Sequence, residues 1–145
     1  MATVERNQEL NGLLVDVYRS LLQYAVEAWP WTAADAEVGL AAVRELAARQ
    51  AGHAADIVDL LASRNWVVDF GIYPTDYTDL HYVALSYFLR LLEASQQELV
   101  AEIEQTLERC RDDERAAHAV SRLLESQRDI VKSLKELRQQ APSGV

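Results

Sequence analysis

The chain has 145 residues, enough for one domain, and half of them are apolar. It carries 14 Lys and Arg residues against 23 Asp and Glu residues, so its formal net charge is −9 at pH 7. This acidic balance argues against a nucleic-acid-binding surface, which needs clustered basic side chains, and against adhesion to anionic membranes. The apolar content is too high for a disordered chain and is sufficient for one sizeable core.

Several absences bear on where the protein resides. The single cysteine, Cys110, cannot form a disulfide within the chain, so nothing indicates an oxidising compartment. The N-terminal residues contain no apolar signal core, and no apolar run is long enough to span a bilayer. We therefore expect a cytoplasmic protein with one domain over residues 1–140 and a frayed C-terminal tail over residues 141–145.

Helix-breaking residues are scarce and divide the chain into long segments. Pro30, Pro74 and Pro142 mark the breaks, and Gly71 lies near the second of them. The segments between are rich in Ala, Leu, Glu, Gln and Arg, which favour helices, and no alternating pattern of a strand is present. The predicted fold class is therefore all-α.

The first half of the chain predicts two helices. Residues 4–28 form the first, which Pro30 ends, and its apolar residues recur every three or four positions. Thr32 is a plausible N-cap for the second helix, which extends to residue 63. The two apolar stripes are Leu10, Leu13, Leu14, Val17, Leu21 and Tyr24, and Leu40, Val43, Leu46, Ile57, Leu60 and Leu61.

The second half predicts two more helices, over residues 78–109 and 113–139. The break between them rests on the run Arg111-Asp112-Asp113, which contains neither Gly nor Pro. Without that break the two would form one very long helix, and the bundle would have to close by dimerisation. The apolar stripes are Leu85, Phe88, Leu92, Leu99 and Ile103, and Val120, Leu124, Val131 and Leu134.

The connections alternate between short and long. Residues 29–32 and 110–112 are short links, which make antiparallel neighbours, whereas residues 64–77 form a long crossover between the second and third helices. This order of connections is typical of a ferritin-like four-helix bundle with one crossover.

The first two helices also carry sequence features of a known family. The run Leu10-Asn11-Gly12-Leu13-Leu14, followed by Gln23-Tyr24, resembles the first helix of the bacterioferritins. His53, followed by Ala54, stands where those proteins carry Glu-x-x-His. The resemblance implies a ferritin-like fold and, in the family, a di-iron or di-manganese centre. Two helices each supply a Glu to this centre, and two each supply a Glu-x-x-His pair.

The family's ligand positions, carried over to this chain, retain almost none of these ligands. With helical periodicity placing the positions on the last two helices, the six positions are Val17, Gln50, His53, Leu92, Leu124 and Gln127. Only His53 is a ligand of the expected type, and a different register of the third helix would add only Glu93. Four carboxylates would neutralise two divalent ions, and burying the metal charge without them is costly.

We therefore expect no cofactor, and catalysis is in doubt. The favoured function is a non-catalytic binding or assembly module. The alternative is a protein that binds iron, manganese or a small ligand through His53. At the former metal position we expect a buried polar cluster of Gln50, His53 and Gln127, with the Tyr24 hydroxyl, in which every group is hydrogen-bonded.

The crossover is unusually aromatic for a solvated loop. With the residues flanking Pro30, its rings either pack on the flank of the bundle or form a homodimer interface or the mouth of a pocket. We expect self-association, most simply as a homodimer. A further partner, either a protein or a small molecule, is also expected, and the sequence does not identify it. The aromatic residues are Trp29, Trp31, Trp66, Phe70, Tyr73 and Tyr77.

Three further residues receive structural interpretations. His118 follows Glu114 by four positions, a spacing that also suits a metal pair, but we interpret both as part of a charged first turn. His81 is interpreted as a packing or capping residue. Cys110 lies among charged residues without a recognisable Cys–His–acid arrangement, and we treat it as a bystander.

Overall fold

The chain is helical throughout the part described by a computed structural model, which covers residues 2–29 and 34–140. Within these ranges it contains no strand, and the predicted all-α class is confirmed. Pro30, Trp31 and Thr32, and the expected tail over residues 141–145, lie outside the described residues. The elements are α1 (Ala2–Tyr18), α2 (Leu21–Glu27), α3 (Ala34–Ser63), the 3-10 helix η1 (Thr75–Tyr82), α4 (Leu85–Arg109) and α5 (Glu114–Gln140).

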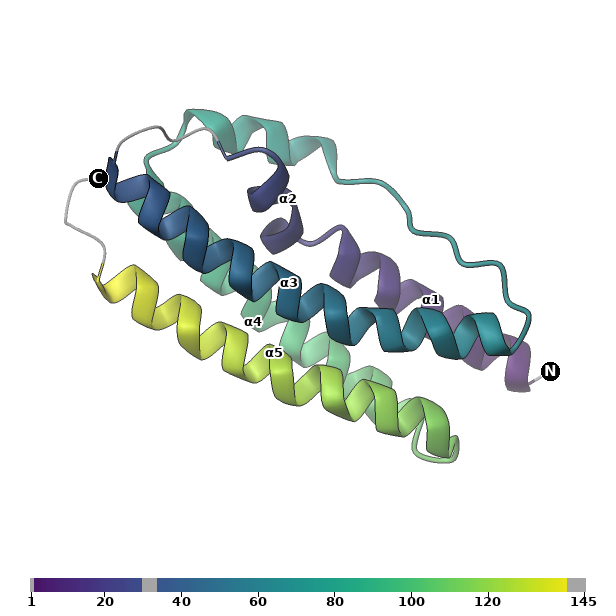
Figure 1. The fold of residues 1–145 in the computed structure, drawn as a ribbon. Coiled ribbons are helices and arrows are strands. Elements are labelled where there is room, and N and C mark those ends of the chain that lie inside the picture. Colours follow the sequence, from purple (N-terminus) through teal and green to yellow (C-terminus); the bar gives the residue numbers. More distant parts are fainter. Residues whose placement is uncertain (1, 30–33, 141–145) are drawn as a thin grey trace.

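The long helices lie side by side along one axis (Figure 1). α5 packs against α3 and α4, and both α1 and α2 pack against the same two helices. α1 and α2 follow one another along the molecule, so together they match the length of one long helix (Figure 1). None of the helices in the described ranges is long and apolar enough to cross a membrane.

The first predicted helix is interrupted, and the prediction of one continuous helix over residues 4–28 is wrong at Ser20. This residue has extended backbone angles, φ −72° and ψ 162°, between the end of α1 and the start of α2. Its side chain is buried, and its hydroxyl donates to the Gln50 side chain at 3.2 Å. Serine is a weak helix former because its hydroxyl competes for hydrogen bonds. Here that hydroxyl is used in the interior.

The predicted break between the last two helices is confirmed, so the single very long helix is excluded. α4 ends at Arg109 and α5 begins at Glu114. Asp113 acts as a cap, since its carboxylate accepts from the backbone N–H of Ala116 at 3.3 Å. The same carboxylate binds Arg64 at 2.8 Å, which joins the turn to the end of α3.

The crossover follows α1 back along the molecule (Figure 1). Its far end forms η1, and α4 begins at Leu85 rather than at residue 78, because Ala84 has an extended ψ of 149°. Asn11 holds the crossover by donating to the carbonyl of Asp69 at 2.8 Å and accepting from its N–H at 3.0 Å. Arg19 donates to the carbonyls of Phe70 and Gly71, each at 3.1 Å.

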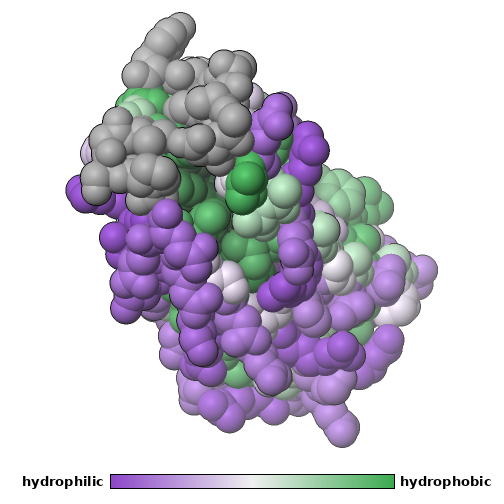
Figure 2. Space-filling view, turned by 60° about the vertical axis from the view of Figure 1, so that its left-hand side comes forward, coloured by the Kyte–Doolittle hydropathy of each residue, from purple (hydrophilic) through white to green (hydrophobic). Residues whose placement is uncertain are grey.

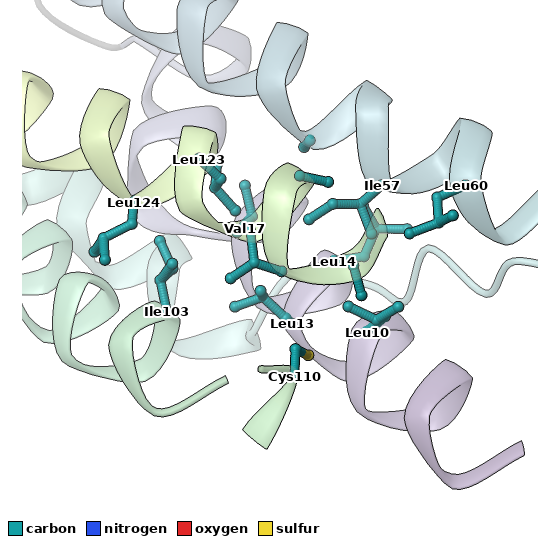
Figure 3. Close-up of a cluster of buried hydrophobic side chains, with 14 of the residues drawn as sticks. Leu10, Leu13, Leu14, Val17, Ile57, Leu60, Ile103, Cys110, Leu123 and Leu124 are labelled. Atoms are coloured by element: carbon teal, nitrogen blue, oxygen red, sulfur yellow. The ribbon is translucent and has the colours of Figure 1, made fainter. Parts of the chain in front are cut away.

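The apolar core is divided into two clusters along the axis. Figure 3 shows part of the first, in which Leu10, Leu13, Leu14 and Val17 of α1 gather with side chains from α3, α4 and α5. The second lies toward the other end and includes Leu22, Val43, Phe88, Leu92 and Ile130. Between the two clusters, α3, α4 and α5 each place a fully buried glutamine: Gln50, Gln96 and Gln127.

Candidate functional site

These three glutamines bind one another at the centre of the molecule. The Gln50 amide nitrogen donates to the side-chain oxygens of Gln96 and Gln127, both at 2.8 Å. The Gln127 amide nitrogen donates to the side-chain oxygen of Gln96 at 2.9 Å and to its main-chain oxygen at 3.1 Å. All three side chains are fully buried, so these bonds replace the water that each amide loses on folding.

The junction of α1 and α2 completes the arrangement. Besides the Ser20 hydroxyl, the Gln23 amide nitrogen donates to the Gln50 side-chain oxygen, at 3.0 Å. Gln23 also donates to the carbonyl of Ala47 at 2.8 Å. We call Ser20, Gln23, Gln50, Gln96 and Gln127 the glutamine cluster. Every helical segment that surrounds the centre therefore contributes to it.

The sequence-based cluster was correct for Gln50 and Gln127 and wrong for His53. The structure brings Gln50 and Gln127 together, but His53 is elsewhere, partly exposed in a groove between α3 and α5. It is turned away because Ala54, four residues after Gln50, takes the inward position on α3. The Tyr24 ring packs edge-on against Tyr73, with centroids 5.2 Å apart.

The cluster member that the sequence-based interpretation missed is Gln96. Leu92 was chosen as the inward position on the third helix, and it is indeed buried, but within the second apolar cluster. Gln96 lies one turn further on the same face, and its spacing from Leu99 and Ile103 was the available signal. The alternative Glu93 lies elsewhere, because its carboxylate binds Arg138 at 2.6 Å.

Two of the remaining ligand positions carried over from the family, Val17 and Leu124, lie in the apolar core. Val17 is fully buried in the first apolar cluster, and Leu124 belongs to the same cluster. In the first part of the bundle, the buried polar side chain at the centre is that of Ser20, which lies in the junction between α1 and α2, three residues after Val17.

The glutamine cluster does not fit a di-metal centre of the carboxylate type. Its side chains are neutral amides and a hydroxyl, and they cannot balance the charge of two divalent ions. The amide oxygens that would be the ligands already accept hydrogen bonds from neighbouring side chains. In the described part of the chain, no group of three or more His, Cys, Asp or Glu residues is arranged to hold a metal ion.

A pair of carboxylates lies beside the cluster. Asp16 of α1 and Glu102 of α4 line a pocket of about 220 Å³ that also reaches Gln96 and Tyr77. Partial burial, together with the hydrogen bond and the negative charge of Asp16, raises the pKa of Glu102 to about 8. At neutral pH the Glu102 carboxyl therefore keeps its proton. No sequence pattern indicated this pair, because its members are far apart in the chain.

Most aromatic residues of the crossover pack along α1 and α2. The Trp66 indole N–H donates to the Asn11 side-chain oxygen at 3.2 Å. The Phe70 ring lies edge-on to Tyr18 with centroids 5.6 Å apart, and the Arg19 guanidinium lies 4.9 Å from the centre of the Tyr73 ring. These contacts agree with packing on the flank. Trp31, the remaining ring of the expected patch, lies outside the described residues.

Two other rings lie near the opposite end of the crossover. Tyr77 contacts Tyr24 with centroids 5.3 Å apart, and Trp29 lies edge-on to Phe88 at 6.3 Å. Apolar surface nevertheless remains exposed on the crossover, where Val67 is 91 % and Ile72 is 84 % exposed. Figure 2 shows a further apolar area at the end of the molecule where α3 begins, bordered by hydrophilic side chains.

The remaining candidates have no evident chemistry. Glu114 and His118 line a groove of about 480 Å³ between α3 and α5, together with Asp56 and Asp59. The side chain of His81 is outside the described part. Cys110 is fully buried in the first apolar cluster, and this burial raises the pKa of its thiol to about 11, which leaves it unreactive at neutral pH.

Comparisons with protein-family models, with curated proteins and with solved structures found no match to this chain.

Proposed function

We propose that the chain is a ferritin-like four-helix bundle that has lost its di-metal centre and acts in the cytoplasm as a non-catalytic binding or assembly module. The observation that carries the proposal is the glutamine cluster. It occupies the level at which all the surrounding helical segments converge, and its Gln50, Gln96 and Gln127 come from α3, α4 and α5.

The ferritin-like part of the proposal rests on the path of the chain. α1 and α2 together take the place of one helix, the crossover separates α3 from α4, and a short turn joins α4 to α5. Bundles of this kind build their metal sites from inward carboxylates at mid-height. A glutamine has the shape of a glutamate without its charge, so the same positions can be filled while metal affinity is lost.

The cluster then has a structural role in place of the metal. The side-chain amide nitrogens of Gln50 and Gln127 both donate hydrogen bonds to side-chain oxygens on other helices. Such a network is satisfied in only one axial alignment, because sliding a helix by one turn would leave buried amides unpaired. We infer that the network fixes the register of α3, α4 and α5.

Metal content tests the proposal directly. The protein, purified without chelator, is offered Fe(II) and Mn(II) anaerobically and measured by elemental analysis. We expect no stoichiometric metal. The triple variant Q50E/Q96E/Q127E is expected to gain metal binding, and Gln97→Glu, at an exposed position of α4, serves as its matched control. Two ions per wild-type chain would overturn the proposal and restore an oxidase-type function.

Self-association is the second part of the proposed role. The exposed side chains of Val67 and Ile72 and the apolar area of Figure 2 support it. A homodimer is the simplest form of self-association. We expect light scattering on the metal-free protein to give twice the molar mass of one chain, and the mass of a single chain would contradict self-association.

A further inference from the structure

His53 has no part in the glutamine cluster, yet it lines a groove with unusual chemistry. The groove lies between α3 and α5 and has a volume of about 290 Å³, near the lower end of the range for small-molecule pockets. It is lined by Arg49 and His53 from α3 and by Arg122, Glu125, Ser126 and Asp129 from α5.

Ser126 is the feature that points to a ligand. Its side chain is only 7 % exposed, and its hydroxyl oxygen is buried without a hydrogen-bond partner among the described residues. Buried hydroxyl groups in native proteins are nearly always bonded, and an exception is commonly explained by a missing water, ion or ligand. Ser126 also lines the groove, so a rotation of its side chain about χ1 would turn the buried hydroxyl toward a molecule bound there, which would supply the absent partner.

The basic side chains of the groove suit a carboxylate. Arg122 has no acidic partner within 4.0 Å in the described part of the chain, whereas Arg49 already pairs with Glu45 at 2.9 Å. A free guanidinium binds a carboxylate through two parallel hydrogen bonds. The His53 imidazole and the Ser126 hydroxyl are further donors on the same lining.

The acidic side chains restrict the ligand further. Glu125 and Asp129 line the same groove, and neither forms an ion pair within the described residues. Two carboxylates beside the guanidinium repel a ligand that is only anionic, and they attract an ammonium group. A molecule that carries both a carboxylate and an ammonium group matches both sides of the lining.

We propose that the His53–Ser126 groove binds a small zwitterion, of which a free α-amino acid is the simplest. The ligand carboxylate binds Arg122 and the Ser126 hydroxyl, and its ammonium group binds Glu125 or Asp129. The inference deepens the proposed binding role and rests on it, but it does not depend on the glutamine cluster.

A titration followed by two-dimensional NMR tests the site. L-Alanine is added to the full-length protein, and acetate, ethylamine and inorganic phosphate are added separately as partial mimics. We expect saturable shifts of the Ser126 and His53 signals with L-alanine. The binding of each partial mimic is expected to be weaker by about tenfold or more, the change produced by losing one charged contact.

Three variants locate the site. Arg122→Gln and Ser126→Ala are each expected to weaken L-alanine binding by about tenfold. Arg128→Gln is the matched control on α5, because Arg128 pairs with Glu104 at 3.5 Å and does not line the groove, and its affinity should equal that of the wild type. Ser126→Ala should also melt no lower than the wild type, since the hydroxyl has no partner to lose.

Several outcomes would overturn the site. These are the absence of saturable shifts with L-alanine, equal binding of acetate or phosphate, unchanged affinity of Ser126→Ala, or a lowered melting temperature of that variant. If the protein is metal-free and does not bind L-alanine, only the proposed groove site is refuted. If the protein binds both L-alanine and two metal ions, only the proposed loss of the metal centre is refuted.

Discussion

Gln50 is the residue on which the buried hydrogen bonds converge. Its amide nitrogen serves Gln96 and Gln127, and its oxygen accepts from Ser20 and Gln23. No single apolar substitution can satisfy these partners, because each would keep a buried polar group without a bond. The stability of the centre is therefore expected to depend on this side chain more than on any one neighbour.

Gln50→Ala is expected to lower the free energy of unfolding by about 3–5 kcal/mol, through a cavity and several unpaired amides. The matched control is Gln97→Ala, at an exposed position of α4, which should change it by less than about 0.5 kcal/mol. Urea denaturation followed by circular dichroism measures both. A Gln50→Ala protein as stable as the control would show that the cluster contributes little.

At the scale of single residues, the sequence predicted that Gln50 and Gln127 point inward and meet, but it did not identify Gln96 as a third member. Periodicity identified Gln50 and Gln127 correctly. It could not choose between Leu92 and Gln96, because both lie on the inward face of α4 and differ only by one turn along the axis. That choice depends on the axial alignment of α3, α4 and α5, which no single helix contains.

Among the elements, the crossover is held most closely against α1. Gly71 has a φ of +67°, a conformation that favours glycine, and a Cβ added there would lie 2.6 Å from a methyl carbon of Val15. The crossover can follow α1 only because this position has no side chain. The bonds of Asn11 and Arg19 to the neighbouring carbonyls fix the same stretch of backbone.

Gly71→Ala is expected to lower the free energy of unfolding by about 1–3 kcal/mol, because both the backbone angle and the contact with Val15 become unfavourable. Gly12→Ala is the matched control on α1, where a Cβ meets nothing within 4 Å. It should raise stability by about 0.5–1 kcal/mol, since alanine favours a helix. Thermal unfolding of both variants measures the difference, and equal destabilisation would contradict the proposed close approach.

The elements themselves were largely predictable, except where a tertiary contact overrides local preference. The turn between α4 and α5 was predicted from Asp112 and Asp113, which are short polar residues suited to a cap. The interruption at Ser20 was not predicted, because its cause is a hydrogen bond to Gln50 on another helix. The 3-10 helix over Thr75–Tyr82 was likewise hidden within the predicted crossover and helix.

For the whole molecule, the contact of α1 with α4 includes two carboxylates of like charge. Asp16 and Glu102 line one pocket, which contains no Lys, Arg or His among its described lining residues. This part of the contact becomes less favourable once Glu102 loses its proton, so its contribution to folding depends on pH.

Stability is expected to fall as the pH rises. The folded-state pKa of Glu102, about 8, is above its ordinary value of 4.5, so the folded chain binds this proton more tightly than the unfolded chain. The contribution is complete below pH 4.5 and is lost as the pH rises through 8. Melting temperatures across this range measure it. Glu102→Gln should flatten the slope, whereas Glu104→Gln, on the same helix, should not, and a wild-type slope in Glu102→Gln would refute the assignment.

By itself, the sequence determined the helical class, the scarcity of breaks, and the inward face of each long helix, because these follow from contacts within a few turns of one chain segment. The tertiary structure alone decided three things: the inclusion of Gln96 in the glutamine cluster, the turning of His53 and Ser126 into a groove, and the pairing of Asp16 with Glu102. Each depends on how helices distant in sequence are aligned and rotated against one another. That alignment is set by the packing of the two apolar clusters, which belongs to the molecule as a whole.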